Sequence, residues 1–306
     1  MQIINFIKNW ALLISILLGV VGYRWFLKAT SITPYLLFFM LLFTFCRISP
    51  REIRFKRMHL WFLFIQLAGG LALYALCAPF DRTVAECFMM CVLAPTAAAS
   101  AVVTMKLGGN GATNTSYVLL SSTMVSIVAP LLFPIVHPMP GHASFWTACF
   151  GILCRVMPIL IGPFVTAFLL KAVWPKLHAG MAKHHDISFY LWATCLVFAT
   201  AQTTDVIVSE QDAGLLELLM VGGAGVLCLL QFYIGKRLGA PVGESVSGGQ
   251  SLGQKNIVLA MWIAAIYLSH LSLAGLGSYI IWQNLFNSWQ LYKQRKRETV
   301  YSHLSP

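Results

Sequence analysis

The sequence has few charged residues and no polar stretch long enough to form a separate soluble domain. Asp, Glu, Lys and Arg make up only 10% of its 306 residues, whereas about 25% is usual for a soluble protein. Hydrophobic residues make up 58%, and the mean hydropathy is +0.75. The apolar runs are long and do not alternate with polar residues, which favours helices over barrel strands. We therefore predict an all-α integral membrane protein.

Residue patterns that carry catalysis or metal binding are also scarce. There is no HExxH motif, no carboxylate pair within an apolar run, and no metal-ligand spacing among the eight histidines. We therefore expect that the chain is not an enzyme and needs no cofactor beyond a coupling ion. The eight cysteines include no CxxC pair. Cys87 and Cys91 are four residues apart and share a helix face. They either pack as small apolar side chains or form a soft site for arsenite-like species.

Ten apolar segments are candidates for membrane spans, which take about 20 residues each. The second and seventh are short. The first ends at Tyr23-Arg24-Trp25 rather than at a small-residue cleavage site, so we predict a span and not a signal peptide. The ten segments are Trp10–Phe26, Thr33–Cys46, Leu60–Pro79, Thr83–Leu107, Ser116–Val136, Ser144–Trp174, Ile187–Ala201, Ala213–Ile234, Val242–Ser269 and Ala274–Tyr292.

Lys and Arg are unevenly distributed between the predicted loops. With a cytoplasmic N-terminus, the outer side holds Arg24, Lys28, Arg82, Asp81, Asp205, Glu210 and Asp212. The inner side holds Lys8, Arg47, Arg51, Arg54, Lys56, Arg57, Lys171, Lys176, Lys183, Lys236, Arg237, Lys293, Arg295, Lys296 and Arg297. Cytoplasmic loops carry an excess of such residues. We predict a multi-pass protein of the inner (plasma) membrane with both termini cytoplasmic, and we read the net charge of +11 as a topology signal rather than nucleic-acid binding.

Two of the predicted spans are interrupted by Pro or Gly. The fourth contains Pro95 among small residues and ends at the glycine-rich 108–111, and the ninth contains Gly248, Gly249 and Gly253. Interrupted spans at matching positions of two halves are typical of transporter binding sites. Each is the fourth of five spans, and an odd number of spans per half inverts the second half. We therefore predict one membrane domain with an inverted 5+5 repeat, residues 1–140 and 141–306, in which helices 4 and 9 are broken.

Polar side chains within the apolar segments are the candidate site residues. Lys255 has at least 13 span residues on each side, and an ionised lysine at the bilayer centre costs about 2.5–3.5 kcal/mol. It is either paired internally or takes part in substrate or ion coupling. Gln66 either joins two helices or lines a cavity, and the amide of Asn284 is difficult to satisfy in lipid. The other candidates, some of which can bond to their own helices, are Ser100, Thr104, Ser122, Gln250, Gln254 and Asn256.

Five segments form an ordered pattern along the chain. They are RISPREIRF, APTAAASAVVTMKLGGN, STMVSIVAPLLFPIV, SGGQSLGQKNIVLA and SYIIWQNLFNSW. Together they resemble the bile acid:sodium symporter family over nearly the whole chain, which looks like a divergent bacterial-type member. The resemblance implies a panel domain and a core domain, with spans four and nine crossing at their breaks. It also implies secondary active transport, usually driven by sodium, of small organic anions such as bile acids, keto acids or pantoate-like acids.

The family's sodium ligands are only partly present under this resemblance. Gln66 matches a glutamine on span three. Ser100 matches the serine of a Ser-Asn pair at the first break, where Ala101 replaces the asparagine. Val118 and Ser122 stand at the places of a serine and a threonine on span five.

The ninth span departs most from the family pattern. Gln250 replaces a glutamate, Gln254 is kept, and Lys255 replaces an asparagine. The chain thus lacks the carboxylate and has gained an ammonium, which would repel sodium strongly in a low-dielectric setting. We hypothesise that Lys255 replaces at least one sodium, and either binds the substrate anion or carries a coupling proton. The positions where sodium could still bind are Gln66, Ser100, Ser122, Gln250 and Gln254.

Two further functions stay open at this stage. A channel or sensor could share the fold without ion coupling, and an arsenite-type efflux permease would fit the cysteine-rich spans. The predicted partners are the lipid bilayer and a small organic anion. We expect no nucleic acid and no obligate protein partner.

Overall fold

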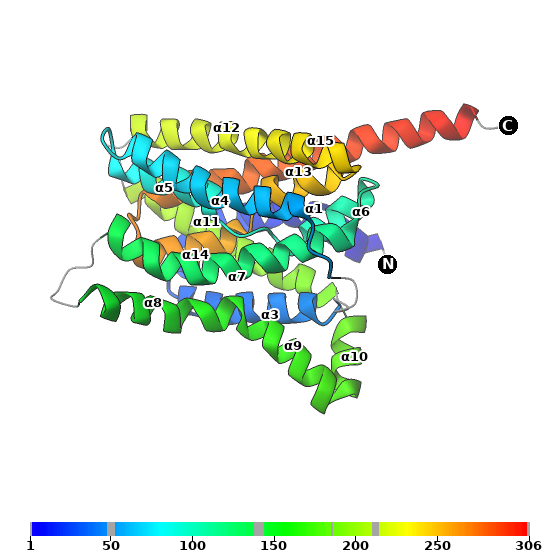
Figure 1. The fold of residues 1–306 in the computed structure, drawn as a ribbon, viewed down its shortest axis with the longest axis horizontal. Helices are drawn as coiled ribbons and strands as arrows, with labels where there is room; N and C mark the ends of the chain where they lie inside the picture. Colours follow the sequence, from blue (N-terminus) through cyan, green and yellow to red (C-terminus); the bar gives the residue numbers. More distant parts are fainter. Residues whose placement is uncertain (1, 48–52, 138–143, 185, 210–213, 305–306) are drawn as a thin grey trace.

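The computed structural model describes residues 2–47, 53–137, 144–184, 186–209 and 214–304. Most of the helices run side by side in one bundle, α9 and α10 project from one edge, and α15 extends beyond the other helices (Figure 1). The helices are α1 (Gln2–Val21), α2 (Tyr23–Leu27), α3 (Thr33–Phe45), α4 (Arg57–Cys77), α5 (Arg82–Leu93), α6 (Ser100–Lys106), α7 (Gly111–Val136), α8 (Phe145–Leu160), α9 (Gly162–Val173), α10 (Pro175–Lys183), α11 (Asp186–Ser209), α12 (Gly214–Gly239), α13 (Ser245–Gly253), α14 (Ile257–Tyr267) and α15 (Ser272–Leu304).

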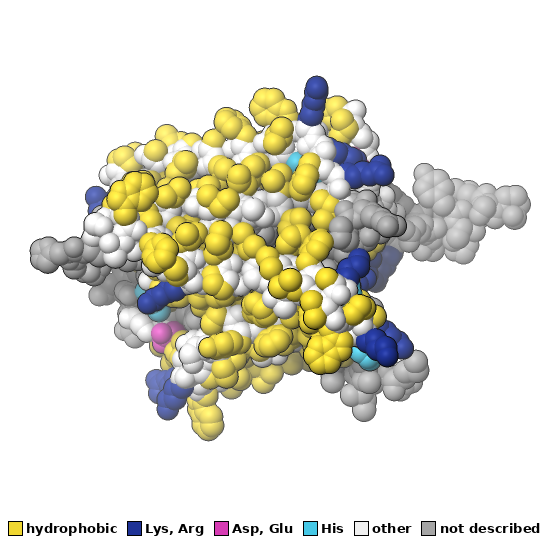
Figure 2. Space-filling view, turned by 60° about the horizontal axis from the view of Figure 1, so that its bottom comes forward, with side chains coloured by type: hydrophobic (Ala, Val, Ile, Leu, Met, Phe, Trp, Pro, Cys, Tyr) yellow, Lys and Arg dark blue, Asp and Glu magenta, His cyan; other side chains and the backbone are white. Residues whose placement is uncertain are grey.

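Four helical segments in the described part of the chain are long and apolar enough to cross a membrane. They are Arg57–Cys77, Gly111–Val136, Ile187–Ser209 and Gly214–Val242, and α8 with α9, bent by 47°, counts as a fifth if the pair is one span. Large apolar side chains lie on the outside of the bundle. Phe80 is 90% exposed, and Figure 2 shows hydrophobic side chains across the middle of one face with Lys and Arg near its ends. An apolar surface of this extent suits contact with lipid, so the chain is a multi-pass membrane protein.

Each of the ten predicted spans contains helix, but several boundaries differ from the prediction. α11 continues to Ser209, past the predicted end at Ala201. α15 continues to Leu304, past the predicted end of the tenth segment at Tyr292, because Leu, Lys, Gln, Arg and Glu in this segment are strong helix formers. The predicted loop after Trp174 contains α10, which begins with a proline at its first position. The count of ten spans and the inverted repeat stay predictions.

Some predictions fall on residues that the structure does not describe. The boundary between residues 140 and 141 is one of them, and so are the positions of Arg51, Glu210 and Asp212. The side chains of Lys8 and Arg297 are likewise outside the described part.

The helices pack in two groups. One contains α1, α3, α8, α9 and α11, and the other contains α4 to α7 with α12 to α15. The groups meet where α7 packs against α8 and where α11 packs against α14 and α15. Both interrupted segments belong to the second group.

The backbones of α12 and α13 are in direct contact. A Cβ atom on Gly235 would lie 2.2 Å from the carbonyl oxygen of Gly248, and one on Gly248 would lie 2.2 Å from that of Gly235. Small residues let membrane helices approach this closely. Gly248 and Gly249 therefore serve packing inside α13, and the prediction that they interrupt the ninth span was wrong. The interruption lies after Gly253, at residues 254–256.

Candidate functional site

Both interruptions have a local cause in the backbone. Ala94 ends α5 with φ −46° and ψ 136°, because a residue that precedes proline is pushed out of the helical region. Gln254 ends α13 in an extended conformation, with φ −94° and ψ 97°. Each interruption leaves the last carbonyl groups of one helix without partners in that helix. In a membrane interior those groups must be satisfied by other parts of the protein.

The two interruptions satisfy part of this need by pairing with each other. Thr96 and Lys255 form an isolated antiparallel bridge. The Ala97 N–H donates to the Gln254 carbonyl at 2.9 Å, and the Asn256 N–H donates to the Pro95 carbonyl at 2.7 Å. The broken helices therefore cross at their breaks, as predicted.

Two predicted site residues cap the end of α5. The Lys255 ammonium donates to the Val92 carbonyl at 2.8 Å. The side-chain amide of Gln66 donates to the Leu93 and Ala94 carbonyls at 2.8 and 3.0 Å. The end of a helix carries a partial negative charge that a cation stabilises. Lys255 is only 1% exposed, and it forms no ion pair with a carboxylate within the described residues.

The end of α13 is capped in a similar way. The Thr96 hydroxyl donates to the Ser251 carbonyl at 2.6 Å, and the Tyr279 hydroxyl donates to the Gly253 carbonyl at 3.0 Å. Each broken helix thus has its last carbonyls bonded by side chains from other elements. Neither Thr96 nor Tyr279 could be predicted from the sequence, because a threonine or tyrosine in an apolar run has many ordinary roles.

A buried asparagine connects the two broken segments a second time. The Ser100 hydroxyl donates to Asn114 Oδ1 at 2.6 Å, and Asn114 Nδ2 donates to Ser251 Oγ at 3.0 Å. All three side chains are inaccessible to solvent. Asn114 lies on α7. Its amide bonds to Ser100, which is next to Ala101, the residue that stands where the family resemblance implies an asparagine. The signal in the sequence was an amide close to the start of a predicted span, and Asn114 was not among the predicted site residues.

A comparison with known families finds a match for this chain. The model of the sodium bile acid symporter family matches residues 34–210, more than half of the chain. The chain belongs to the sodium bile acid symporter family. Members of this family are transporters and not enzymes, which confirms the prediction on both points. A comparison with curated proteins finds no match. The matched range covers the first break and ends before the second.

One sequence pattern could suggest an enzyme despite this family. Residues 249–253 read Gly-Gln-Ser-Leu-Gly, which fits the Gly-x-Ser-x-Gly pattern of hydrolases. In those enzymes the serine stands on a sharp turn between a strand and a helix. Here Ser251 lies inside α13, and its hydroxyl accepts from Asn114. The pattern is therefore part of the crossing and not a nucleophile site.

Helix α15 contributes to the crossing through residues that were not predicted. The Lys255 N–H donates to Gln283 Oε1 at 2.9 Å, and Gln250 Nε2 donates to Asn287 Oδ1 at 2.8 Å. The predicted residue Asn284 instead donates to the Ile280 carbonyl of its own helix. Gln283 and Asn287 are four residues apart and share the helix face that meets the crossing.

The other predicted residues lie nearby with different roles. Asn256 caps α14 by accepting from the Leu259 N–H at 3.3 Å. Thr104 is buried without a hydrogen bond for its hydroxyl. Ser122 is buried, but it is Ser121 that accepts from the Thr96 N–H, at 3.1 Å.

The five predicted sodium positions differ in whether their side-chain oxygens are free, and sodium binding there stays a prediction. Gln66 directs its N–H groups at the end of α5, and its oxygen accepts from Tyr117. Ser100 donates to Asn114. The side-chain oxygens of Gln250 and Gln254 are buried without a partner, so two hard oxygens of the set stay free. No group of three or more His, Cys, Asp or Glu side chains in the described ranges could hold a metal ion.

Proposed function

We propose that the chain is a secondary active transporter of small organic anions, which works by alternating access around the crossing of α5/α6 with α13/α14. The observation that carries this proposal is the direct pairing of the two breaks, Thr96 with Lys255. Transporters with inverted repeats bind substrate and coupling ion at such discontinuous helices. The division of the helices into two groups offers the two bodies that would rock against each other.

Two buried carboxylates support the inverted 5+5 repeat. Glu86, near the start of α5, accepts from the Ser269 N–H in the turn after α14, at 2.7 Å. Glu244, just before α13, accepts from Asn110 in the turn after α6, at 3.3 Å. Each half therefore holds the turn that follows the broken helix of the other half. This reciprocal relation is what an inverted repeat with helices 4 and 9 as counterparts predicts.

Lys255 takes the place of a coupling cation in this proposal. Its ammonium lies against the Val92 carbonyl at the end of α5, where positive charge is favoured. A sodium ion beside it would meet strong repulsion in a low-dielectric interior. The burial of Lys255 favours a tethered cation over direct binding of the substrate. A proton, rather than sodium, is then the coupling ion that we expect to drive transport.

The excess of Lys and Arg in alternate loops supports an inner-membrane protein with both termini cytoplasmic. The same alternation supports ten spans, because the chain must pass through the membrane once each time that successive loops change side. The partners in this account are the bilayer and the anion.

The proposal is tested by uptake into proteoliposomes of pyruvate, pantoate and cholate, each with sodium, with potassium and with an inward proton gradient. Lys255→Met removes the buried charge and keeps the side-chain length. Lys106→Met is the matched control, because Lys106 is exposed at the end of α6. We expect uptake that does not need sodium, is lost in Lys255→Met and persists in Lys106→Met.

Two results would refute this proposal in different parts. Uptake that requires sodium and persists in Lys255→Met would exclude a tethered cation. Uptake without counterflow would indicate a channel, since only a carrier exchanges labelled for unlabelled substrate through an alternating site.

A further inference from the structure

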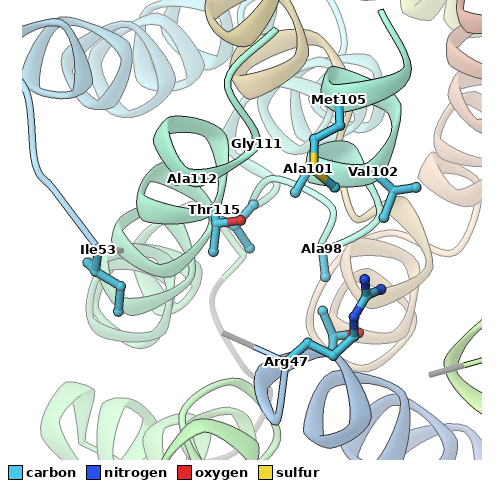
Figure 3. A pocket seen from close by; sticks show the side chains of 11 residues that line it. Arg47, Ile53, Ala98, Ala101, Val102, Met105, Gly111, Ala112 and Thr115 are labelled. Carbon is cyan, nitrogen blue, oxygen red and sulfur yellow. The ribbon is translucent and has the colours of Figure 1, made fainter. Parts of the chain in front are cut away.

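A cavity of about 230 Å³ opens beside the first break. It lies between the end of α3 and the segment that contains α6 and the start of α7 (Figure 3). Small residues such as Ala98, Ala101 and Ala112 form much of its wall. Sites for drug-sized ligands measure about 300–1,000 Å³. This cavity therefore suits a compact molecule better than a steroid.

The positive charge in this cavity comes from Arg47. Arg47 follows α3, in the group of helices opposite the crossing, and its guanidinium extends toward Ala98 in Figure 3. No carboxylate forms an ion pair with Arg47 in the part of the chain that the structure describes. Thr115 on the facing wall adds a hydroxyl. The buried Lys255 is not among the residues that line the cavity.

A second cavity provides a contrast. It measures about 270 Å³ and lies between α1 and α11 on one side and α12 and α15 on the other. Its wall is aliphatic apart from Thr200, Thr203 and Ser278, and no charged residue lines it. Both cavities lie between the two groups of helices. Only the cavity beside the first break, which we call the Arg47 cavity, offers a charge to an anion.

We propose that Arg47 binds the carboxylate of a compact organic anion in the Arg47 cavity. This inference rests on the proposed function and extends it, because it names the anion-recognising residue and limits the size of the substrate. A guanidinium presents a planar set of N–H donors that fits a carboxylate with two parallel hydrogen bonds. Arg47 follows a helix of one group, and Ala98 lies in the other group. An anion bound between them would therefore contact both of the helix groups that rock against each other.

The experiment compares Arg47→Gln and Arg47→Lys with wild type and with the control Arg57→Gln. Arg57 is an exposed arginine of the same region that does not line the cavity. Binding of labelled pantoate to the purified protein and uptake of pantoate into proteoliposomes are both measured. We expect Arg47→Gln to raise the Kd and the KM on the order of tenfold to hundredfold. Arg47→Lys keeps the charge without the paired donors, so its effect is smaller, and Arg57→Gln matches wild type.

Substrate size gives an independent measurement. We expect excess cholate to leave pantoate binding unchanged, whereas excess pyruvate competes with it. Equal competition by cholate would overturn the compact-substrate part of the inference.

The outcomes separate the inference from the proposed function. If wild type takes up pantoate and Arg47→Gln has the same KM and Kd, the role of Arg47 is refuted and the transporter proposal stands. If wild type binds pantoate through Arg47 but shows no uptake or counterflow, the binding site stands and the transport proposal fails. If wild type neither binds nor carries any of the three anions, both are refuted.

Discussion

The contact between α12 and α13 gives a prediction about stability that can be worked out from two glycines. In Gly235→Ala the new Cβ would lie 2.2 Å from the Gly248 carbonyl oxygen, whereas carbon–oxygen contacts between backbones are about 3.3–3.6 Å. The helices would have to separate by about 1 Å, because the backbone fixes the position of the Cβ and the oxygen is itself a backbone atom, so neither can rotate away. Overpacking of this kind costs about 1–3 kcal/mol.

Gly222 on the same helix is the matched control. A Cβ there meets no atom within 4 Å, so Gly222→Ala gains only helix propensity, about 0.8–1 kcal/mol. We therefore expect the stabilities of the two variants to change in opposite directions and to differ by about 2–4 kcal/mol. Gly235→Ala should also slow uptake, because α13 carries the second break.

The assay is thermal unfolding of both variants in the same detergent, followed by uptake at a temperature where each is folded. Wild type should unfold between the two variants. If Gly235→Ala were as stable as Gly222→Ala, the close backbone contact would not exist in the protein, and the position of α13 in this account would be wrong.

The remaining predictions concern the hydrogen bonds around the crossing. Asn114→Ala leaves two buried hydroxyls without their shared amide, and we expect a loss of about 1–3 kcal/mol in thermal unfolding together with a loss of uptake. Tyr279→Phe leaves the Gly253 carbonyl without its donor, so stability should fall by about 1–2 kcal/mol; an unchanged unfolding temperature would contradict the capping of α13. Glu244→Gln removes the charge that Lys56, Ser247 and Thr113 contact, and we expect the unfolding temperature to fall, whereas Glu244→Asp should restore part of it.

The sequence predicted the first break well because its cause is local. Pro95 forces the preceding residue out of the helix whatever surrounds it, so the chain alone fixes where α5 ends. Lys255 was found for a similar reason, since a lysine far from both ends of a span must have an internal partner.

The second break was misplaced because a glycine has two uses that look the same in a sequence. Gly248 could either end a helix or let another backbone approach. Its contact with Gly235 of α12 shows that it lets another backbone approach. Contacts between distant elements decided this position.

The sequence alone did not show which polar residues of α15 meet the crossing, because side chains point in different directions around the helix axis. Successive helix residues are about 100° apart around the axis, so Asn284 and its neighbour Gln283 point in different directions. A single sequence with polar residues at both positions does not show which one meets the crossing. The amide of Asn114 was missed because it lies 14 residues from its serine partner on another helix.

The central claim is that the Lys255 ammonium stands where relatives of this chain would hold a coupling cation. The most direct measurement is the sodium dependence of initial pantoate uptake in wild type and in the double variant Gln250→Glu, Lys255→Asn, which puts a carboxylate and an amide at the second break. We predict that wild-type uptake is indifferent to sodium and that the folded double variant is stimulated by it. Sodium-dependent uptake in wild type, or a folded double variant that carries pantoate without any response to sodium, would contradict the account.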